Sequence, residues 1–122
     1  PGPQNAWMEK YMFPGAYTPT LSEQFPSIER AKLFVSDVEI LRLHYAETLK
    51  LWREAFEKNR ETIASMYDEK FCRMWEFYLA GCETAFRHGV LMVFQIQLSK
   101  SLSTVPLTRD YISDFEKSHF EI

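Results

Sequence analysis

Metal binding and phosphate binding are the first kinds of chemistry for which the sequence can be searched, and neither is indicated. Segment 44–66 carries glutamates, but no histidine joins them at the spacing of metal ligands, so we expect a solvated helix face and no metal site. The chain has only four glycines, which leaves little room for a glycine-rich phosphate loop. The glutamates are Glu47, Glu54, Glu57 and Glu61.

The histidines and cysteines have ordinary structural explanations. His44 stands where a helix should begin, His88 stands where one should end and suits the helix dipole, and His119 lies in a polar tail. Cys72 and Cys82, if they share one helix, are about 15 Å apart along its axis, too far for a disulfide. Two reduced, buried cysteines are expected, and these indicate a cytoplasmic protein.

Charge and composition exclude some classes of partner. The net charge is −3 and no basic patch stands out, so we expect no nucleic-acid binding. No apolar run approaches the roughly 20 residues that span a bilayer, and no signal peptide is visible. Aromatic residues make up 16% of the chain, which predicts either an aromatic core or rings that line an apolar cavity.

Two long amphipathic helices dominate the predicted structure. The first covers 44–66, and the second runs from an N-cap at Asp68 to about His88, with Gly89 suited to the position after its end. A short joint between them predicts a helical hairpin. Their apolar stripes are Tyr45, Leu49, Trp52, Phe56 and Ile63 in the first, and Phe71, Trp75, Tyr78, Leu79, Cys82 and Phe86 in the second.

The remaining elements are shorter. Residues 7–13 are expected to be a strand or an extended piece ended by Pro14-Gly15, and Thr20 is expected to cap a short helix from Leu21. Residues 32–40 and 90–99 read as strands, and in the second Gln95 and Gln97 point away from the apolar side. After Lys100 the tail is polar: 108–111 would dock locally and the last ten residues would fray.

Three motifs carry a family resemblance. They read W-M-E-K-Y-M-F-P-G-A-Y-T-P-T-L at 7–21, H-Y-A-E-T-L-K-L-W at 44–52, and D-E-K-F-C-R-M-W-E-F-Y-L-A-G-C-E-T-A-F-R-H-G at 68–89. In this order and spacing, the chain resembles the C-terminal part of the cyclopropane-fatty-acyl-phospholipid synthases and mycolic acid cyclopropane synthases. The resemblance assigns all 122 residues to one C-terminal portion of a methyltransferase domain, with 7–100 matched to the family and 101–122 as a tail.

The resemblance implies a fold and a reaction. The fold would be an α+β segment of an α/β S-adenosylmethionine-dependent methyltransferase, with two long amphipathic helices and a few strands but without the cofactor-binding half. The reaction would add a methylene group across the cis double bond of an unsaturated phospholipid acyl chain. S-adenosylmethionine and bicarbonate would serve the complete enzyme, with peripheral contact at the inner membrane face. This segment alone is expected to be inactive.

The same resemblance assigns two site residues. Tyr45 would help to hold the bicarbonate, and a phenol hydroxyl can indeed donate a hydrogen bond to an anion. Phe13 would line the acyl pocket. No residue of this segment would bind S-adenosylmethionine. The sequence departs from the family pattern before His44, where Leu41 and Arg42 stand in a segment that usually contains glycine, and this difference bears on pocket shape and substrate preference.

Two other functions remain open from the sequence. Some amine N-methyltransferases share a similar H-Y-A-x-T motif and Pro-Gly turn, and their acceptor is a nitrogen lone pair. The chain could instead be a free-standing binding or oligomerisation module, since a segment without its sheet exposes an apolar face and could form a homodimer to cover it. The helix stripes would then be core residues instead of the lining of an acyl channel.

Overall fold

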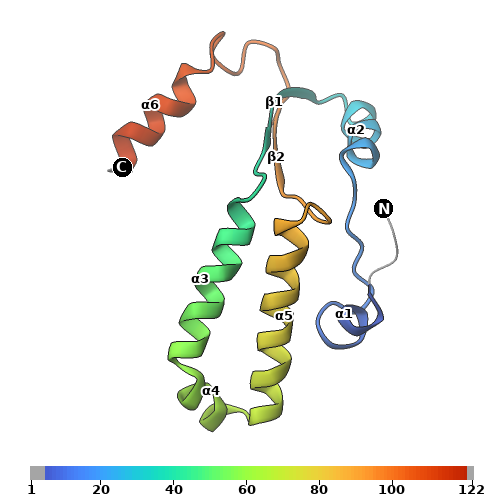
Figure 1. Cartoon of the computed structure of the whole chain (residues 1–122). Helices are drawn as coiled ribbons and strands as arrows, with labels where there is room; N and C mark the ends of the chain where they lie inside the picture. The colour runs from blue at the N-terminus through green and yellow to red at the C-terminus, as the bar shows by residue number, and fades with distance from the viewer. Residues whose placement is uncertain (1–4, 121–122) are drawn as a thin grey trace. The chain divides into compact units, whose positions relative to one another are not determined.

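Two helices packed side by side make up the largest part of the computed structural model, which describes residues 5–120 (Figure 1). They are α3 (His44–Lys58) and α5 (Glu69–Arg87), and the short α4 (Arg60–Met66) joins them. The chain divides into two compact units. The hairpin unit holds residues 5–17 and 39–95, and the tail unit holds residues 18–38 and 96–120.

The predicted hairpin is confirmed, but the prediction of one helix over 44–66 is wrong at its centre. The helix ends at Lys58 and a new one begins at Arg60. At the break, the side-chain amide of Asn59 donates a hydrogen bond of 2.8 Å to the carbonyl oxygen of Ala55. Asparagine side chains compete in this way with the backbone bonds of a helix, so Asn59 turns the chain early toward α5.

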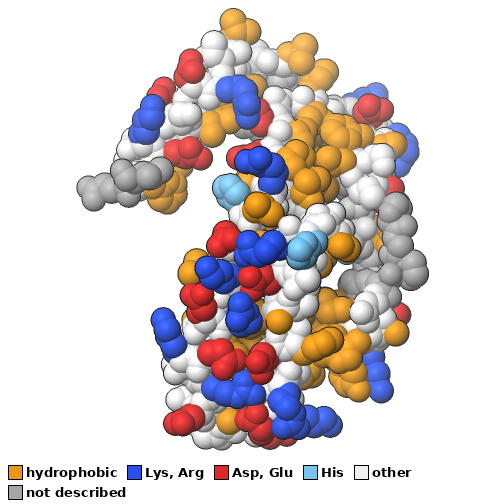
Figure 2. Space-filling view, in the orientation of Figure 1, with side chains coloured by type: hydrophobic (Ala, Val, Ile, Leu, Met, Phe, Trp, Pro, Cys, Tyr) orange, Lys and Arg blue, Asp and Glu red, His pale blue; other side chains and the backbone are white. Residues whose placement is uncertain are grey.

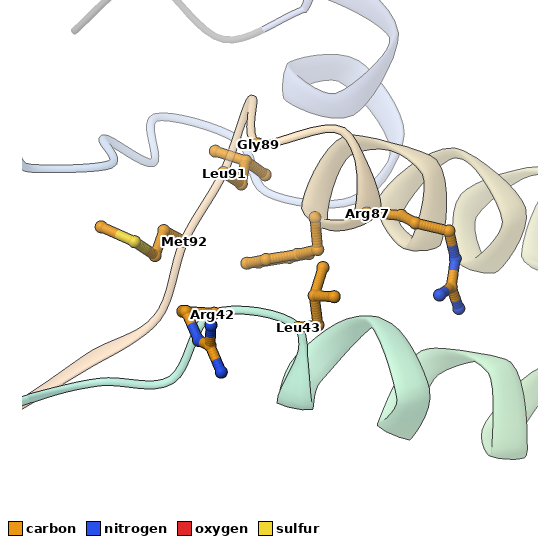
Figure 3. Close-up of a pocket in the computed structure, with 7 residues that line it drawn as sticks. Arg42, Leu43, Arg87, Gly89, Leu91 and Met92 are labelled. Atoms are coloured by element: carbon orange, nitrogen blue, oxygen red, sulfur yellow. The ribbon is translucent and has the colours of Figure 1, made fainter.

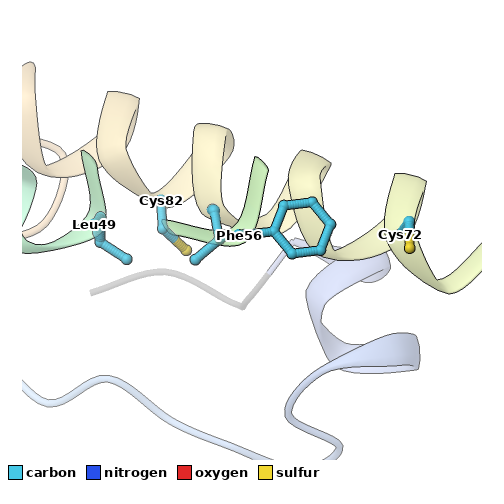
Figure 4. Close-up of a cluster of buried hydrophobic side chains, with 5 residues drawn as sticks. Leu49, Phe56, Cys72 and Cys82 are labelled. Atoms are coloured by element: carbon cyan, nitrogen blue, oxygen red, sulfur yellow. The ribbon is translucent and has the colours of Figure 1, made fainter. Parts of the chain in front are cut away.

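The core of the hairpin unit lies between α3 and α5 (Figure 4). Leu49, Cys72 and Leu79 are completely buried, and Phe56 and Cys82 are nearly so. Both predicted stripes are therefore largely correct, and both cysteines are buried free thiols as expected. Trp52 is the exception, because 49% of it is exposed.

On the face of the hairpin seen in Figure 2, acidic and basic side chains lie next to one another. Arg60, at the start of α4, makes ion pairs with Glu57 at 3.2 Å, Glu69 at 2.7 Å and Glu76 at 2.9 Å. Its side chain is only 25% exposed. The hydrogen bonds that Arg60 donates to Glu69 and Glu76 raise the pKa of Arg60 above its ordinary value. One guanidinium therefore holds the ends of α3 and α5 to α4.

Replacing Arg60 with glutamine should lower the free energy of unfolding of the chain. The substitution removes the shared cation and leaves Glu57, Glu69 and Glu76 close together, where like charges repel. Urea denaturation at low and high ionic strength would measure the effect, which should shrink as salt screens the carboxylates. An equal loss for Arg73→Gln, a change at an exposed arginine of α5, would show that Arg60 has no special role.

The segment 7–13 does not form the strand or extended piece that its aromatic residues predicted. It forms α1 (Ala6–Tyr11), because Asn5 caps the helix by accepting the Trp7 backbone N–H at 2.8 Å. Packing also favours the helix: Met8 lies against the hairpin core, and the Trp7 ring lies edge-on to Phe77 at 4.8 Å. Tertiary contacts thus outweigh the strand preference of aromatic residues.

Within the tail unit, α2 (Leu21–Arg30) begins where Thr20 was expected to cap it. The Glu23 carboxylate accepts the Thr20 backbone N–H at 2.7 Å, a reciprocal cap that starts the helix. The helix is longer than predicted and continues through Pro26, which cannot donate the hydrogen bond of that position.

The strands β1 (Phe34–Ile40) and β2 (Phe94–Ser99) form the two-stranded sheet of the described residues. The Leu41 N–H donates to the Val93 carbonyl at 2.9 Å, and the Ser36 hydroxyl donates to the Gln97 carbonyl at 3.2 Å. The partner of the later residue of β1 thus has the lower residue number on the β2 side, so the two strands run antiparallel.

The second strand is shorter than the predicted 90–99 because its first residues complete the end of α5. The N–H groups of Val90 and Leu91 bond to the Ala85 carbonyl, and Gly89 takes a positive φ of 74°. The predicted alternation also fails near the end of the strand. Gln97 is half-buried, since its amide oxygen accepts the Tyr111 hydroxyl at 2.6 Å, whereas 41% of Leu98 is exposed.

The tail after Lys100 docks within its unit, as predicted for 108–111. Arg109 pairs with Asp37 at 2.6 Å, and Tyr111 bonds to Gln97. The prediction of a frayed end is wrong over most of its length, because α6 (Asp110–His119) forms there; residues 121 and 122 lie outside the described residues. Among the described residues, the helices are too short or too polar to cross a bilayer.

Candidate active-site face

The predicted site tyrosine lies in the first turn of α3, held between two other rings. Tyr45 is half-buried. Its ring meets Phe86 of α5 edge-on at a centroid distance of 4.8 Å, and Trp52 of its own helix at 6.0 Å. Such edge-to-face contacts fix the plane of a ring. The packing therefore sets the position of the phenol.

A second tyrosine, Tyr78 of α5, packs against the same core cluster as Tyr45. The Tyr78 hydroxyl donates a hydrogen bond to the Cys82 thiol, one helical turn further along α5. Burial raises the pKa of Tyr78 to about 12, and the electrostatic influence of Cys82 and Tyr45 adds to the effect. Burial also raises the pKa of Cys82, although the bond from Tyr78 partly offsets it. At neutral pH the Tyr78 hydroxyl and the Cys82 thiol are therefore both uncharged.

The predicted acyl-pocket residue, Phe13, joins the same face. Its ring lies edge-on to Tyr78 at 6.0 Å, just before the turn in which Gly15 takes a φ of 72°. Tyr78 thus contacts Phe13 and is influenced electrostatically by Tyr45, although 31 residues separate Phe13 from Tyr45 in the sequence. We call Phe13, Tyr45, Tyr78, Cys82 and Phe86 the tyrosine face.

The chemistry available on the tyrosine face is narrow. It offers two phenol hydroxyls and a thiol among aromatic rings, with no carboxylate or imidazole in that group. Such a surface can accept an apolar chain and donate hydrogen bonds to a small anion, but it supplies no base of its own at neutral pH. The sequence pattern assigns Tyr78 and Cys82 only to a core stripe. Their spacing of four residues on one helix is the signal that could have predicted the hydrogen bond between them.

The charged residues nearby form a structural lattice. The Glu83 carboxylate accepts hydrogen bonds from Arg53 of α3 and Arg87 of α5, and Arg87 also pairs with Glu47 at 2.9 Å. Burial alone would raise the pKa of Glu83, but the bonds from Arg87 and Arg53 outweigh it and lower that pKa. This lattice joins the two helices beside the tyrosine face. Glu47 itself is exposed, as expected for a solvated helix face, although it pairs with Arg87.

The lowered pKa of Glu83 predicts how stability depends on pH. The carboxylate stabilises the fold fully above its ordinary pKa of 4.5, and this contribution is lost as the pH falls through the lower folded-state pKa. Glu83→Gln should therefore weaken the dependence of the urea midpoint on pH below about 4.5. Glu54→Gln is the matched control and should leave that dependence nearly unchanged. It changes an exposed carboxylate that, among residues 5–120, forms an ion pair with Lys50 alone, at 4.0 Å.

The histidines lie outside the tyrosine face or at its edge. His44 is exposed at the start of α3, and His88 ends α5. His119 stacks on Phe115 at 4.0 Å near the end of α6. Across residues 5–120, no three or more His, Cys, Asp or Glu side chains come together in a way that could hold a metal ion.

Comparisons with known proteins agree with this architecture. Residues 2–96 match the model of the mycolic acid cyclopropane synthetase family. The chain is 45% identical over 91 residues to the tuberculostearic acid methyltransferase UfaA1 of Mycobacterium tuberculosis, and 41% identical over 108 residues to a probable fatty acid methyltransferase of Pseudomonas putida. These matches cover 73% and 85% of this chain, respectively. The chain therefore belongs to the mycolic acid cyclopropane synthetase family.

Solved structures show the same relationship. The cyclopropane synthase MmaA2 of Mycobacterium tuberculosis superimposes with a TM-score of 0.73 at 28% identity, over 75% of this chain. The mycolic acid cyclopropane synthase CmaA1, solved in complex with SAH and CTAB, gives a TM-score of 0.72. The chain spans only 21% and 27% of the two relatives named above and 32% of each solved chain.

Proposed function

We propose that these 122 residues are the C-terminal portion of an S-adenosylmethionine-dependent methyltransferase that acts on unsaturated acyl chains, with 7–100 as the part shared with the family and 101–122 as a tail. The preferred reaction adds a methylene group across a cis double bond of a phospholipid. The observation that carries the proposal is the tyrosine face, where aromatic rings and neutral hydroxyl donors stand together on α3, α5 and the turn after α1.

The residues of the tyrosine face suit the parts proposed for them. The ring of Phe13, together with Tyr78 and Phe86, offers an apolar wall for a hydrocarbon chain. The Tyr45 hydroxyl would donate a hydrogen bond to an anion such as bicarbonate, and the neighbouring Tyr78 hydroxyl is a second donor. When bound, the bicarbonate supplies the base that this face lacks. The packing around Tyr45 would keep its hydroxyl in place and exclude water.

The cofactor half of the reaction needs residues outside this segment. S-adenosylmethionine would supply the methyl group, but with four glycines the chain offers no glycine-rich loop for it. We therefore propose that the segment alone neither binds S-adenosylmethionine tightly nor turns over. The complete enzyme would be cytoplasmic and would meet its lipid at the inner face of the membrane.

The test is methyl transfer by the full-length protein that carries this segment. S-adenosylmethionine with a labelled methyl group would be offered with a cis-unsaturated phospholipid, with its saturated counterpart, and with small amines. Label in the unsaturated lipid alone supports the proposal, and the mass and fragmentation of the product distinguish a ring from a methyl branch. Label in the amines alone would favour an amine N-methyltransferase and overturn the lipid assignment.

A binding or oligomerisation module is the second candidate, because the hairpin exposes large apolar side chains. Leu51, Met66, Tyr67 and Phe77 are each at least 60% exposed. A second copy could cover them in a homodimer. Sedimentation over a range of concentrations would test this candidate, and a strict monomer at high concentration would count against it.

A further inference from the structure

A hollow adjoins the tyrosine face, and Phe86 belongs to both. It has a volume of about 220 Å³. Its apolar walls come from Leu43, Phe86, Leu91 and Met92, and Arg42 stands at its edge (Figure 3). At ~30 Å³ for each water molecule in the liquid, the hollow could hold roughly seven waters. It could therefore take a short alkyl segment and not a whole acyl chain.

The two arginines at this hollow differ in whether they form ion pairs. Arg87 is engaged by Glu47 and Glu83, and Figure 3 shows its guanidinium directed away from Leu91 and Met92. Arg42 is exposed and makes no ion pair or side-chain hydrogen bond with another described residue. A guanidinium presents several donors in a plane that matches the oxygens of a carboxylate or phosphate. Arg42 is thus a free anion-binding group beside an apolar hollow.

The position of the hollow supports a role in substrate binding. Arg42 and Leu43 lie in the segment between β1 and α3, and Leu91 and Met92 lie in the segment between α5 and β2. Connecting segments held by a rigid scaffold commonly carry binding residues. The hollow also shares a wall with the tyrosine face, because Phe86 lines the hollow while its ring contacts Tyr45 at 4.8 Å. A ligand in the hollow would therefore lie one ring away from the proposed reacting centre.

We infer that this hollow binds the anionic end of a lipid, with Arg42 as the residue that selects a charged headgroup over a neutral one. The carboxylate or phosphate contacts the Arg42 guanidinium, and the adjoining methylene groups lie on Leu43, Leu91 and Met92. This inference rests on the proposed lipid substrate and adds to it a recognition group for the anion. Arg42 acts as a specificity residue and takes no part in the transfer of the methyl group.

Binding to the 122-residue chain tests the inference without any methyl transfer. Decyl phosphate, decanoate and decanol would be titrated calorimetrically below the concentrations at which they form micelles, with inorganic phosphate and acetate as anions without a chain. Both charged amphiphiles should bind about tenfold more tightly than decanol, a difference of one strong charged contact. The ratio of the affinities for decyl phosphate and decanoate then shows whether the hollow prefers the phosphate of a phospholipid or the carboxylate of a fatty acid.

Substitutions distinguish a specific effect of Arg42 from a general effect of the positive charge of the chain. Arg42→Gln should remove the preference for the charged amphiphiles and leave decanol binding unchanged, whereas Arg42→Lys should keep part of the preference. Arg73→Gln removes an exposed arginine of α5 that does not line the hollow, and it should leave the binding of all three amphiphiles unchanged. Met92→Asp places a charge within the hollow and should weaken the binding of all three amphiphiles.

Three results would overturn the inference. The first is equal affinity for decanol and decyl phosphate. The second is that Arg73→Gln reduces the preference for charged amphiphiles as much as Arg42→Gln does. The third is that inorganic phosphate binds as tightly as decyl phosphate. Failure of the full-length protein to methylate lipids, together with Arg42-dependent binding here, would instead count against the proposed reaction alone.

Discussion

Tyr45→Phe in the full-length protein should lower kcat/KM for the lipid substrate by about 10²- to 10³-fold, as the loss of one preorganised hydrogen-bond donor to an anion does in other enzymes. The ring and its contacts with Phe86 and Trp52 remain, so folding should not change. Initial rates of labelled-methyl transfer would measure the effect. High bicarbonate should restore part of the rate if the hydroxyl holds that anion.

Tyr67→Phe is the matched control for this prediction. It removes the same hydroxyl from a tyrosine that lies at the joint between α4 and α5 and is 64% exposed. Its activity should equal that of the unchanged protein. Tyr45→Phe with a full rate would contradict the role proposed for the hydroxyl and leave Tyr45 as a packing residue of the hairpin core.

Leu79→Ala should lower the free energy of unfolding by about 2–5 kcal/mol, the range for large-to-small changes at buried leucines. Leu79 is completely buried between α3 and α5, so the substitution loses apolar burial and leaves a cavity. Since domains of this size are commonly stable by roughly 5–15 kcal/mol, the loss would be a large fraction of the total. Urea denaturation followed by circular dichroism would measure it.

Leu51→Ala is the control for this prediction, because Leu51 lies on the exposed side of α3. Leu51 is 62% exposed, and alanine is the better helix former, so its effect should stay within about 0.5 kcal/mol. Similar losses for Leu51 and Leu79 would mean that the hairpin does not pack in solution as the structure has it.

The parts of the fold set by local chemistry could be predicted from the sequence. Asp68 was expected to cap α5 and accepts the Phe71 N–H at 2.6 Å, and Thr20 begins α2 as expected. The 3.6-residue spacing identified Leu49, Phe56 and Leu79 as core residues. Each of these signals needs only a few neighbouring residues, which is why a single sequence is enough to find it.

The elements that depend on distant contacts could not be predicted. The helix at α1 is stabilised by packing of Met8 and Trp7 on the hairpin, and residues 7–13 alone favour a strand. The tail is held through Tyr111 and Gln97, so neither the burial of Gln97 nor the helix after Asp110 has a local signal.

The candidate site shows the same division. The roles of Tyr45 and Phe13 came from family resemblance and stay proposals, because the spacing of apolar residues only places Tyr45 in a core stripe. The fold adds Tyr78, whose ring contacts Phe13 and which packs against the same core cluster as Tyr45, and that proximity arises from the crossing of α5 with the turn after α1. No local pattern in the sequence encodes such a crossing.

The most direct test of the central claim is photolabelling of the full-length protein with a phospholipid that carries a diazirine beside its cis double bond. Irradiation followed by peptide mass spectrometry would locate the reacting part of the acyl chain. We expect labels at Phe13, Tyr45 or Tyr78, and an excess of unlabelled cis-unsaturated lipid should suppress them. Labels that competitor lipid suppresses but that lie only outside the tyrosine face, for example on α6, would contradict it.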